Sequence, residues 1–320
     1  MGLDVRLVAE QPAIATEAAR PERGALHIVA GAMRSNRKAL VGGVILAAFV
    51  VIAVIPGLLA PYDPHAQIFE QTLGPSREHL LGTTGNGQDI FSQLVWGTRE
   101  SLAIAVVAGL MATVLALLVG VSAAYLGGLS DHLLSLLTDV FLVIPTLPLM
   151  IVVAAYARSG GLAVLIAVIV ITGWSYGARQ LRSQALSLRN RDFLDAARMR
   201  GERTVYVIAF EILPTMTSLI VANFLGAALY AVLAAAGLQF IGLGNPNDLS
   251  WGTMLFWAQN NGALNAGSPL WAVVPGLCIA MLGAAFALLN YAFDEITNPA
   301  LRPKPRRAIE PSIRSSKSAT

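Results

Sequence analysis

Six long apolar runs, separated by polar segments, are spread along this 320-residue chain. Each is close to the roughly 20 residues that an α-helix needs to cross a bilayer. Apolar residues make up 55% of the chain and charged residues only 13%, too few to cover a soluble globule of this size. The sequence therefore predicts an all-α integral membrane protein with six transmembrane helices, at about residues 39–60, 101–126, 132–156, 161–178, 216–243 and 269–292.

The basic residues are sorted along the chain, and this sorting predicts its orientation. Of the 22 Lys and Arg residues, 19 fall in the leader, in the segment between the fourth and fifth runs, or in the tail from Arg302 on. Positive residues are retained on the cytoplasmic side of a membrane. Because six spans put these three segments on one face, we expect both termini and that segment to be cytoplasmic. Basic residues sorted in this way do not form one patch, so no nucleic-acid partner is expected.

The segment between the fourth and fifth runs carries a spaced motif. Its residues are Asp195, Ala196, Ala197, Gly201, Ile212, Leu213 and Pro214. Each of the seven arginines in this segment would cost about 2.5–3.5 kcal/mol at the bilayer centre, so it is not a seventh span. Helix-favouring residues run from about 190 to 199, and Gly201 is a natural stop. A second short helix is expected to turn its apolar residues toward the membrane side, namely Val205, Val207, Ile208, Phe210 and Ile212.

The spacing of this motif resembles the signature of permease subunits of bacterial ABC importers. That signature is Glu-Ala-Ala, three residues, Gly, and an Ile-Leu-Pro whose proline comes thirteen positions after the glycine; Asp195 stands where it has Glu. Further motifs within residues 75–302 are similar to the dipeptide/oligopeptide/nickel class of these permeases. They lie at residues 79–83, 87–89, 92–102, 240–244, 250–252 and 298–302.

The resemblance implies a multi-pass protein of the bacterial plasma membrane with several partners. These are a second, homologous permease subunit that forms a heterodimer with this chain, two ABC ATPase subunits or domains, an extracytoplasmic solute-binding protein and the lipid bilayer. The loop 188–215 would hold the coupling helix, which sits in a groove of an ATPase. ATP and Mg would be used by the ATPase subunits, and no cofactor is expected in this chain.

These expectations divide the chain into five segments. A cytoplasmic leader, partly disordered, precedes the first transmembrane helix, which an external loop connects to the permease core with its remaining five helices. A disordered cytoplasmic tail follows. The bounds are 1–38, 39–60, 61–98, 99–302 and 303–320.

The motifs of enzymes are missing from the sequence. It contains no Gly-x-x-x-x-Gly-Lys-Ser/Thr nucleotide loop, no His-x-x-x-His pair and no Gly-x-Ser-x-Gly elbow, and Cys278 is its single cysteine. We therefore expect no catalytic residues, no metal site and no ATP hydrolysis in this chain. A secondary transporter or channel is the alternative of a different class, but it predicts inverted repeats and paired intramembrane charges that the sequence does not clearly show.

Residues near the external face are candidates for contact with a binding protein. They are Gly82, Thr83, Gly87, Gln88 and Asp89 of the external loop, and Trp251. The alternative for the loop is a structural lid packed on the helix bundle. For Trp251, Trp257 and Trp271 the alternative is a belt of tryptophans at the membrane interface.

Three residues are candidates for the transport pathway. Asp139 lies inside the third span, where a carboxylate normally faces the bundle or an aqueous cavity; the alternative is a solvated or capped group near the cytoplasmic end. Pro145 and Pro148 are expected to kink the same helix. Asn223 has the polar side chain that a channel needs, although a helix-to-helix hydrogen bond is equally consistent with it.

The transported solute is the least constrained inference. The resembling class carries peptides, nickel chelates and, in some members, oligosaccharides. We expect a di- or oligopeptide first. Oligosaccharides are the main alternative, because aromatic and amide residues between Trp251 and Asn261 also suit a sugar, and nickel chelates are another.

Overall fold

A computed structural model describes residues 36–156 and 161–297, with side chains to residue 293. The described chain folds into helices and contains no strand, apart from one isolated bridge between Thr83 and Asp89. The leader and tail, for which disorder was predicted, and the motif at 298–302 fall wholly or mostly outside the described residues.

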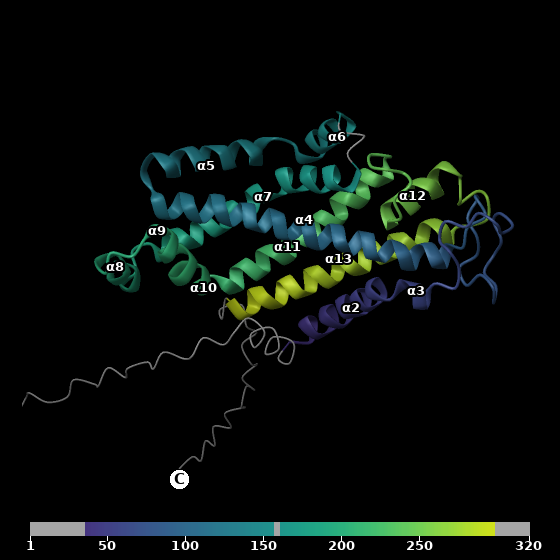
Figure 1. The fold of residues 1–320 in the computed structure, drawn as a ribbon, viewed down its shortest axis with the longest axis horizontal. Helices are drawn as coiled ribbons and strands as arrows, with labels where there is room; N and C mark the ends of the chain where they lie inside the picture. Colours follow the sequence, from purple (N-terminus) through teal and green to yellow (C-terminus); the bar gives the residue numbers. More distant parts are fainter. Residues whose placement is uncertain (1–35, 157–160, 298–320) are drawn as a thin grey trace, which may run out of the picture.

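Five of these helices are long and apolar enough to span a membrane, and a sharply bent pair of helices is the candidate for a sixth span. The five run nearly side by side along the length of the molecule (Figure 1). They are α2 (Arg37–Val54), α4 (Ile90–Leu126), α7 (Gly161–Leu188), α11 (Thr217–Phe240) and α13 (Leu270–Thr297). The predicted all-α membrane fold is therefore confirmed.

The third span is not the single kinked helix that was predicted over residues 132–156. It consists of α5 (Gly128–Val143) and α6 (Thr146–Tyr156), whose axes meet at 88°. Pro145 explains the position of the break: a residue before proline avoids the helical region, and Ile144 is extended with ψ of 129°. Pro148 lies in the first turn of α6, where a missing N–H costs no hydrogen bond.

Several helices extend beyond their apolar runs. The 37 residues of α4 span about 55 Å, well over the roughly 30 Å of hydrocarbon in a bilayer. Its polar first turns begin at Asp89, whose side chain accepts a hydrogen bond from the Ser92 backbone N–H.

The first predicted span, residues 39–60, consists of two helices in the structure. Helix α2 ends at Val54, and after Ile55 the one-turn helix α3 (Pro56–Leu59) follows.

Small residues let the central helices pack closely. Gly120 of α4 lies so near α7 that an added Cβ would come within 2.3 Å of the Ala178 carbonyl oxygen. Further toward the start of α4, a Cβ added at Gly109 would come within 2.9 Å of the backbone of Ala228 in α11. Membrane helices associate through such van der Waals contact, because lipid supplies no hydrophobic drive between them.

Large apolar side chains cover the outer faces of this bundle. On α4 they include Leu110 and Leu118, and on α2 Val44 and Val54, all at least 54% exposed. A soluble protein rarely exposes so continuous an apolar surface, whereas lipid tails solvate it. The exposed faces of the long helices therefore match a bilayer.

The contact between α4 and α7 can be tested with one methyl group. Gly120→Ala should lower the free energy of unfolding by about 1–3 kcal/mol, because the carbonyl that it meets belongs to the backbone and cannot move aside. Gly237→Ala in α11 is the matched control: its Cβ would meet no atom within 4 Å. Thermal unfolding of the two variants in detergent would contradict the packing if both unfolded at the same temperature.

Candidate functional site

The elongated bundle has two different ends (Figure 1). At the α8 end lies the helix α8 (Asp192–Met199), followed by α9 (Thr204–Tyr206), the π-helical segment η2 (Val207–Ile212) and α10 (Leu213–Thr215). At the α12 end lie α12 (Trp251–Asn260) and the loop of residues 61–89. The predicted loop motif and the predicted external residues thus fall at opposite ends.

Two buried side chains hold α8 on the bundle. Leu194 and Ala197 are both 0% exposed and pack in a cluster with Val207, Ile212 and Met216. This cluster continues into α4 and α7 through residues such as Val121 and Leu181. The motif residues Ala197 and Ile212 therefore belong to the buried apolar contact between α8 and the long helices.

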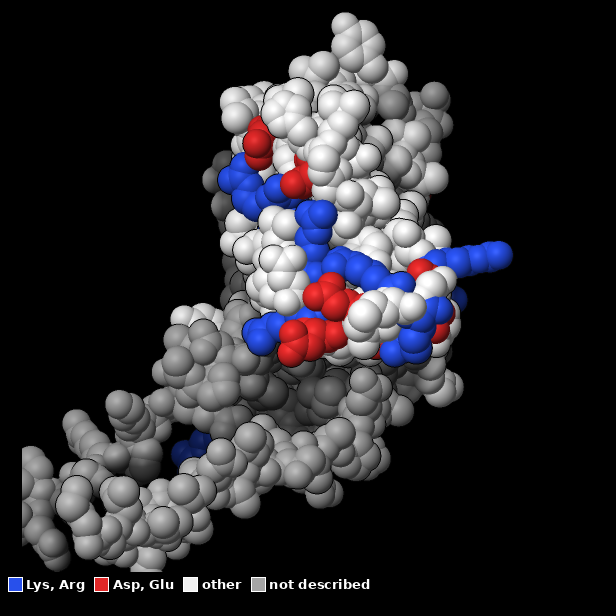
Figure 2. Space-filling view, turned by 90° about the vertical axis from the view of Figure 1, so that its left-hand side faces the viewer, with Lys and Arg blue, Asp and Glu red and all other residues white. Residues whose placement is uncertain are grey.

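The opposite face of α8 is exposed and charged. Asp195 pairs with Arg198 one turn later, at 2.8 Å between Oδ1 and Nη1, and both remain accessible. Contact with Tyr125, whose ring lies 5.4 Å from the guanidinium, and with Asp195 raises the pKa of Arg198, which stays charged. Met199 is 83% exposed beside them. Figure 2 looks onto this end and shows basic and acidic side chains crowded together on it.

Gly201 ends α8 in the left-handed region, with φ of 75°. The Glu202 N–H donates to the Ala197 carbonyl and the Gly201 N–H to that of Arg198, which satisfies two carbonyls at the helix end. The predicted helix stop is therefore confirmed. Pro214 lies in α10, before α11 begins at Thr217, and not at the start of the fifth span itself.

The apolar residues of the second helix lie in two different environments. Val205 and Phe210 are 77% and 66% exposed, whereas Val207 and Ile212 pack into the cluster beneath α8. That the exposed residues turn toward the membrane side stays a prediction. The two alanines also differ: Ala196 is half-buried and faces outward, whereas Ala197 is enclosed by its own chain. Of the pair, only Ala196 offers the small side chain that another surface could approach.

Two ion pairs connect α5 to α7. Arg182 donates to both carboxylate oxygens of Asp131, at 2.7 and 2.9 Å, a bidentate geometry that is stronger than a single contact. Arg179 donates to Asp139 at 2.6 Å, with both side chains more than half exposed. Arg179 thus caps the carboxylate of Asp139, and whether Asp139 belongs to the pathway stays a prediction.

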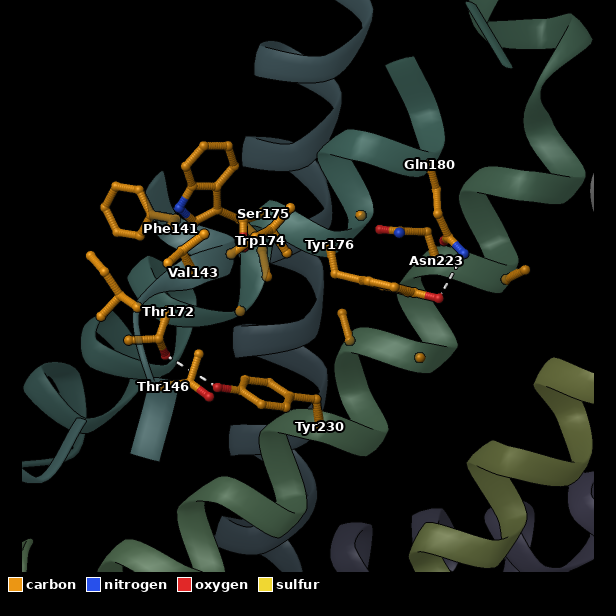
Figure 3. Close-up of a pocket in the computed structure, with 18 of the residues that line it drawn as sticks. Phe141, Val143, Thr146, Thr172, Trp174, Ser175, Tyr176, Gln180, Asn223 and Tyr230 are labelled. Carbon is orange, nitrogen blue, oxygen red and sulfur yellow. Dashed lines mark hydrogen bonds between the residues drawn. The ribbon is translucent and has the colours of Figure 1, made fainter. Parts of the chain in front are cut away.

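A cavity of about 620 Å³ opens where the third span breaks. Its walls come from the α5–α6 break, from α7 and from α11, with single residues of α4 and α13. Figure 3 shows the polar side chains around it. Those labelled there are Thr146, Thr172, Ser175, Tyr176, Gln180, Asn223 and Tyr230.

The lining of this cavity mixes apolar and polar residues, and none of the lining residues described is charged. Hydroxyl groups of Thr172 and Tyr230 lie 3.3 Å apart, and Gln180 donates to the Tyr176 hydroxyl at 3.4 Å. The predicted pathway residues Pro145 and Asn223 both line it, whereas Asp139 does not. Their role in a pathway remains a prediction. No sequence signal identified Tyr176 or Tyr230, since only the fold brings α7 and α11 together around a hollow.

At the α12 end, the loop of residues 61–89 is packed against the bundle. Asp89 accepts from Ser92 at 2.8 Å as the cap of α4, and its other oxygen lies 2.9 Å from His79 Nδ1. The Thr83 hydroxyl donates to the Glu70 carbonyl at 2.6 Å, and Gln88 bonds to Thr84. Gly82 and Gly87 form turns with positive φ. These residues build a lid, the alternative predicted for them.

Trp251 and Trp271 are packing residues rather than members of an interfacial belt. Trp251 is 0% exposed, and its backbone and indole N–H groups donate to Ser101 and Leu94. Trp271 is 1% exposed, and only Trp257 reaches the surface. All six residues predicted to contact a binding protein are buried; that contact stays a prediction, and exposed neighbours would have to make it. The sequence analysis did not predict α12, although the capping box of Ser250 and Thr253 marks its start.

The bundle thus combines a cavity lined by uncharged polar and apolar residues with a charged helix fixed at one end, an arrangement consistent with a transport permease. Residues 112–303 match the family described as binding-protein-dependent transport system inner membrane component. Residues 27–75 match the N-terminal transmembrane domain of oligopeptide transport permease C. The chain therefore belongs to this family of inner-membrane importer permeases.

Curated relatives agree with this assignment. The dipeptide transport system permease protein DppC of Bacillus subtilis is 30% identical over 84% of this chain and 84% of its own length. The nickel transport system permease protein NikC of Escherichia coli is 33% identical over 81% of this chain and 92% of its own. The oligopeptide transport system permease protein OppC of Mycobacterium tuberculosis H37Rv is 32% identical over 69% of this chain and 77% of its own length.

Thiol labelling can test whether the cavity admits solutes. In a Cys278→Ser background, which removes the only cysteine, Asn223→Cys should react with a charged methanethiosulfonate reagent at least about tenfold faster than Leu225→Cys. Leu225 lies two residues further along α11 and is only 6% exposed. Equal labelling of the two cysteines in the purified chain would contradict the cavity.

Proposed function

We propose that residues 188–215 couple this permease to a separate ATPase. The anchoring of α8 carries this proposal: one face is buried with Val207, Ile212 and Met216, while the other is free to bind a partner. A force applied to the free face would be passed through this cluster to α4 and α7. A helix held only by exposed ion pairs would transmit little, since such pairs contribute about 0–1 kcal/mol.

The remaining partners follow from this role. The α8 end faces the cytoplasm, where two ATPase subunits or domains use ATP and Mg, and the α12 end faces the outside, where a solute-binding protein docks. A second, homologous permease completes the passage beside this chain. The charge sorting of the sequence supports this orientation, because most described arginines lie at or near the α8 end.

The solute is a di- or oligopeptide. The cavity supports this choice, because hydroxyl and amide groups such as those of Tyr176, Gln180 and Asn223 can donate to and accept from a peptide backbone. None of its described lining residues is charged, which suits a polar solute better than a bare metal ion. Of the three relatives described above, two carry dipeptide or oligopeptide in their names and one carries nickel.

Two substitutions at Gly201 test the coupling. Gly201→Val should abolish dipeptide uptake and the retention of ATPase subunits on the tagged permease, because a branched side chain at φ of 75° costs about 1–2 kcal/mol and reorients the end of α8. Gly201→Asn, which tolerates this conformation, should retain both activities. Neither variant should alter the amount of permease in the membrane, since no atom lies within 4 Å of the new Cβ. Normal uptake by the valine variant would rule the coupling out.

A further inference from the structure

A cavity at the α12 end is lined by side-chain amides. It measures about 350 Å³ and shares no lining residue with the cavity at the α5–α6 break. Ligand sites typically begin at about this size. Its amides come from the loop of residues 61–89, from the start of α4 and from the turn before α12, and they are Gln67, Asn86, Gln88, Gln93 and Asn247. An amide both donates and accepts hydrogen bonds, so these walls suit a ligand that does the same.

Two of these amides are buried but incompletely bonded. Gln88 is 9% exposed and Gln93 is 7% exposed. Oε1 of Gln88 accepts from the Thr84 hydroxyl at 3.5 Å, and Nε2 of Gln93 donates to the Pro64 carbonyl at 3.3 Å. Their other amide atoms, Nε2 of Gln88 and Oε1 of Gln93, have no partner among the described residues and are not among the unpaired atoms that the protein encloses completely. One donor and one acceptor therefore remain accessible from the cavity.

An aromatic ring lies in the wall of the same cavity. Trp257 is 37% exposed, and its indole N–H already donates to the Pro246 carbonyl at 3.0 Å. The turn that carries Pro246 is fixed in its own right, because Asn245 Nδ2 donates to Asp248 at 2.7 Å. The ring therefore offers a ligand a positioned apolar face.

The charges in this wall disfavour an anionic ligand. Its titratable side chains are Asp248 and the exposed His65, and no Lys or Arg is among the described lining residues. A ligand carboxylate, such as that of a peptide with free ends, would lose water here without gaining a cationic partner. A neutral hydroxyl can donate to Asp248, and it can donate to or accept from the amides.

We propose that this cavity binds a neutral mono- or disaccharide. The sugar hydroxyls bond to the free amide groups of Gln88 and Gln93, with Asp248 as a further acceptor. One face of the sugar ring, which carries C–H groups, lies on Trp257. The site lies apart from the cavity at the α5–α6 break, so it depends neither on the proposed coupling nor on which solute the permease transports.

Saturation-transfer NMR on the full-length chain in phosphatidylcholine nanodiscs tests this site. The probes are two matched pairs, glucose with glucuronate and galactose with galacturonate. At least one neutral sugar should bind saturably and about tenfold more tightly than its carboxylate analogue, because no Lys or Arg in the wall offsets the added charge. The dipeptide Ala-Ala, which also carries a carboxylate, should not displace the bound sugar.

Three variants locate the binding. Gln88→Met keeps the length of the side chain but removes its amide, and should weaken sugar binding about fivefold, the loss of one net hydrogen bond. Gln71→Met is the matched control, since Gln71 is an exposed amide of the same loop that does not line this cavity. Trp257→Ala removes the exposed ring, leaves the buried amides in place and should also weaken binding, which separates loss of the site from misfolding of the Gln88 variant.

Four results would overturn the proposal. They are no saturable binding of either neutral sugar, equal binding of a sugar and its carboxylate analogue, displacement of the sugar by Ala-Ala, and unchanged binding in both Gln88→Met and Trp257→Ala.

Discussion

Burial of Leu194 and Ala197 beneath α8 is the contact on which the proposed function depends. Their partners Val207, Ile212 and Met216 lie on the chain that leads into α11, and the same cluster reaches into α4 and α7. Since protein interiors pack as densely as organic crystals, displacement of α8 cannot be absorbed locally and must be shared with these helices. The small residues between α4 and α7 extend the same stiff contact toward the middle of the bundle.

The break at Pro145, unlike the tightly packed cluster beneath α8, separates helices and leaves a cavity between them. A continuous third span would lie along α7, whereas the 88° turn moves α6 away from the axis of α5 and opens the cavity beside Thr172 and Asn223. The ion pairs of Asp131 and Asp139 hold α5 on α7 between this cavity and the α8 end. The half of the span between the cavity and the α8 end is thus held partly by charged contacts, which rearrange at lower cost than a packed apolar core, beside the aromatic contact of Phe141 with Trp174.

The sequence predicted those features that depend on local composition. Long apolar runs define spans because backbone groups in lipid must bond within a helix, and the spacing of Gly201 after Asp195 placed the end of α8 correctly. It did not predict which of Ala196 and Ala197 is buried, since this depends on how α8 docks. The buried tryptophans and the cavity likewise arise from the packing of distant segments, which no local pattern encodes.

The most direct test of the coupling proposal is photo-crosslinking in whole cells from two exposed positions at opposite ends. Met199 is 83% exposed on α8, and Leu264, after α12, is 68% exposed. With a photoreactive amino acid in place of each in turn, position 199 should capture an ATPase subunit and position 264 should capture none. Capture of the ATPase from position 264, with none from position 199, would contradict both the orientation and the coupling.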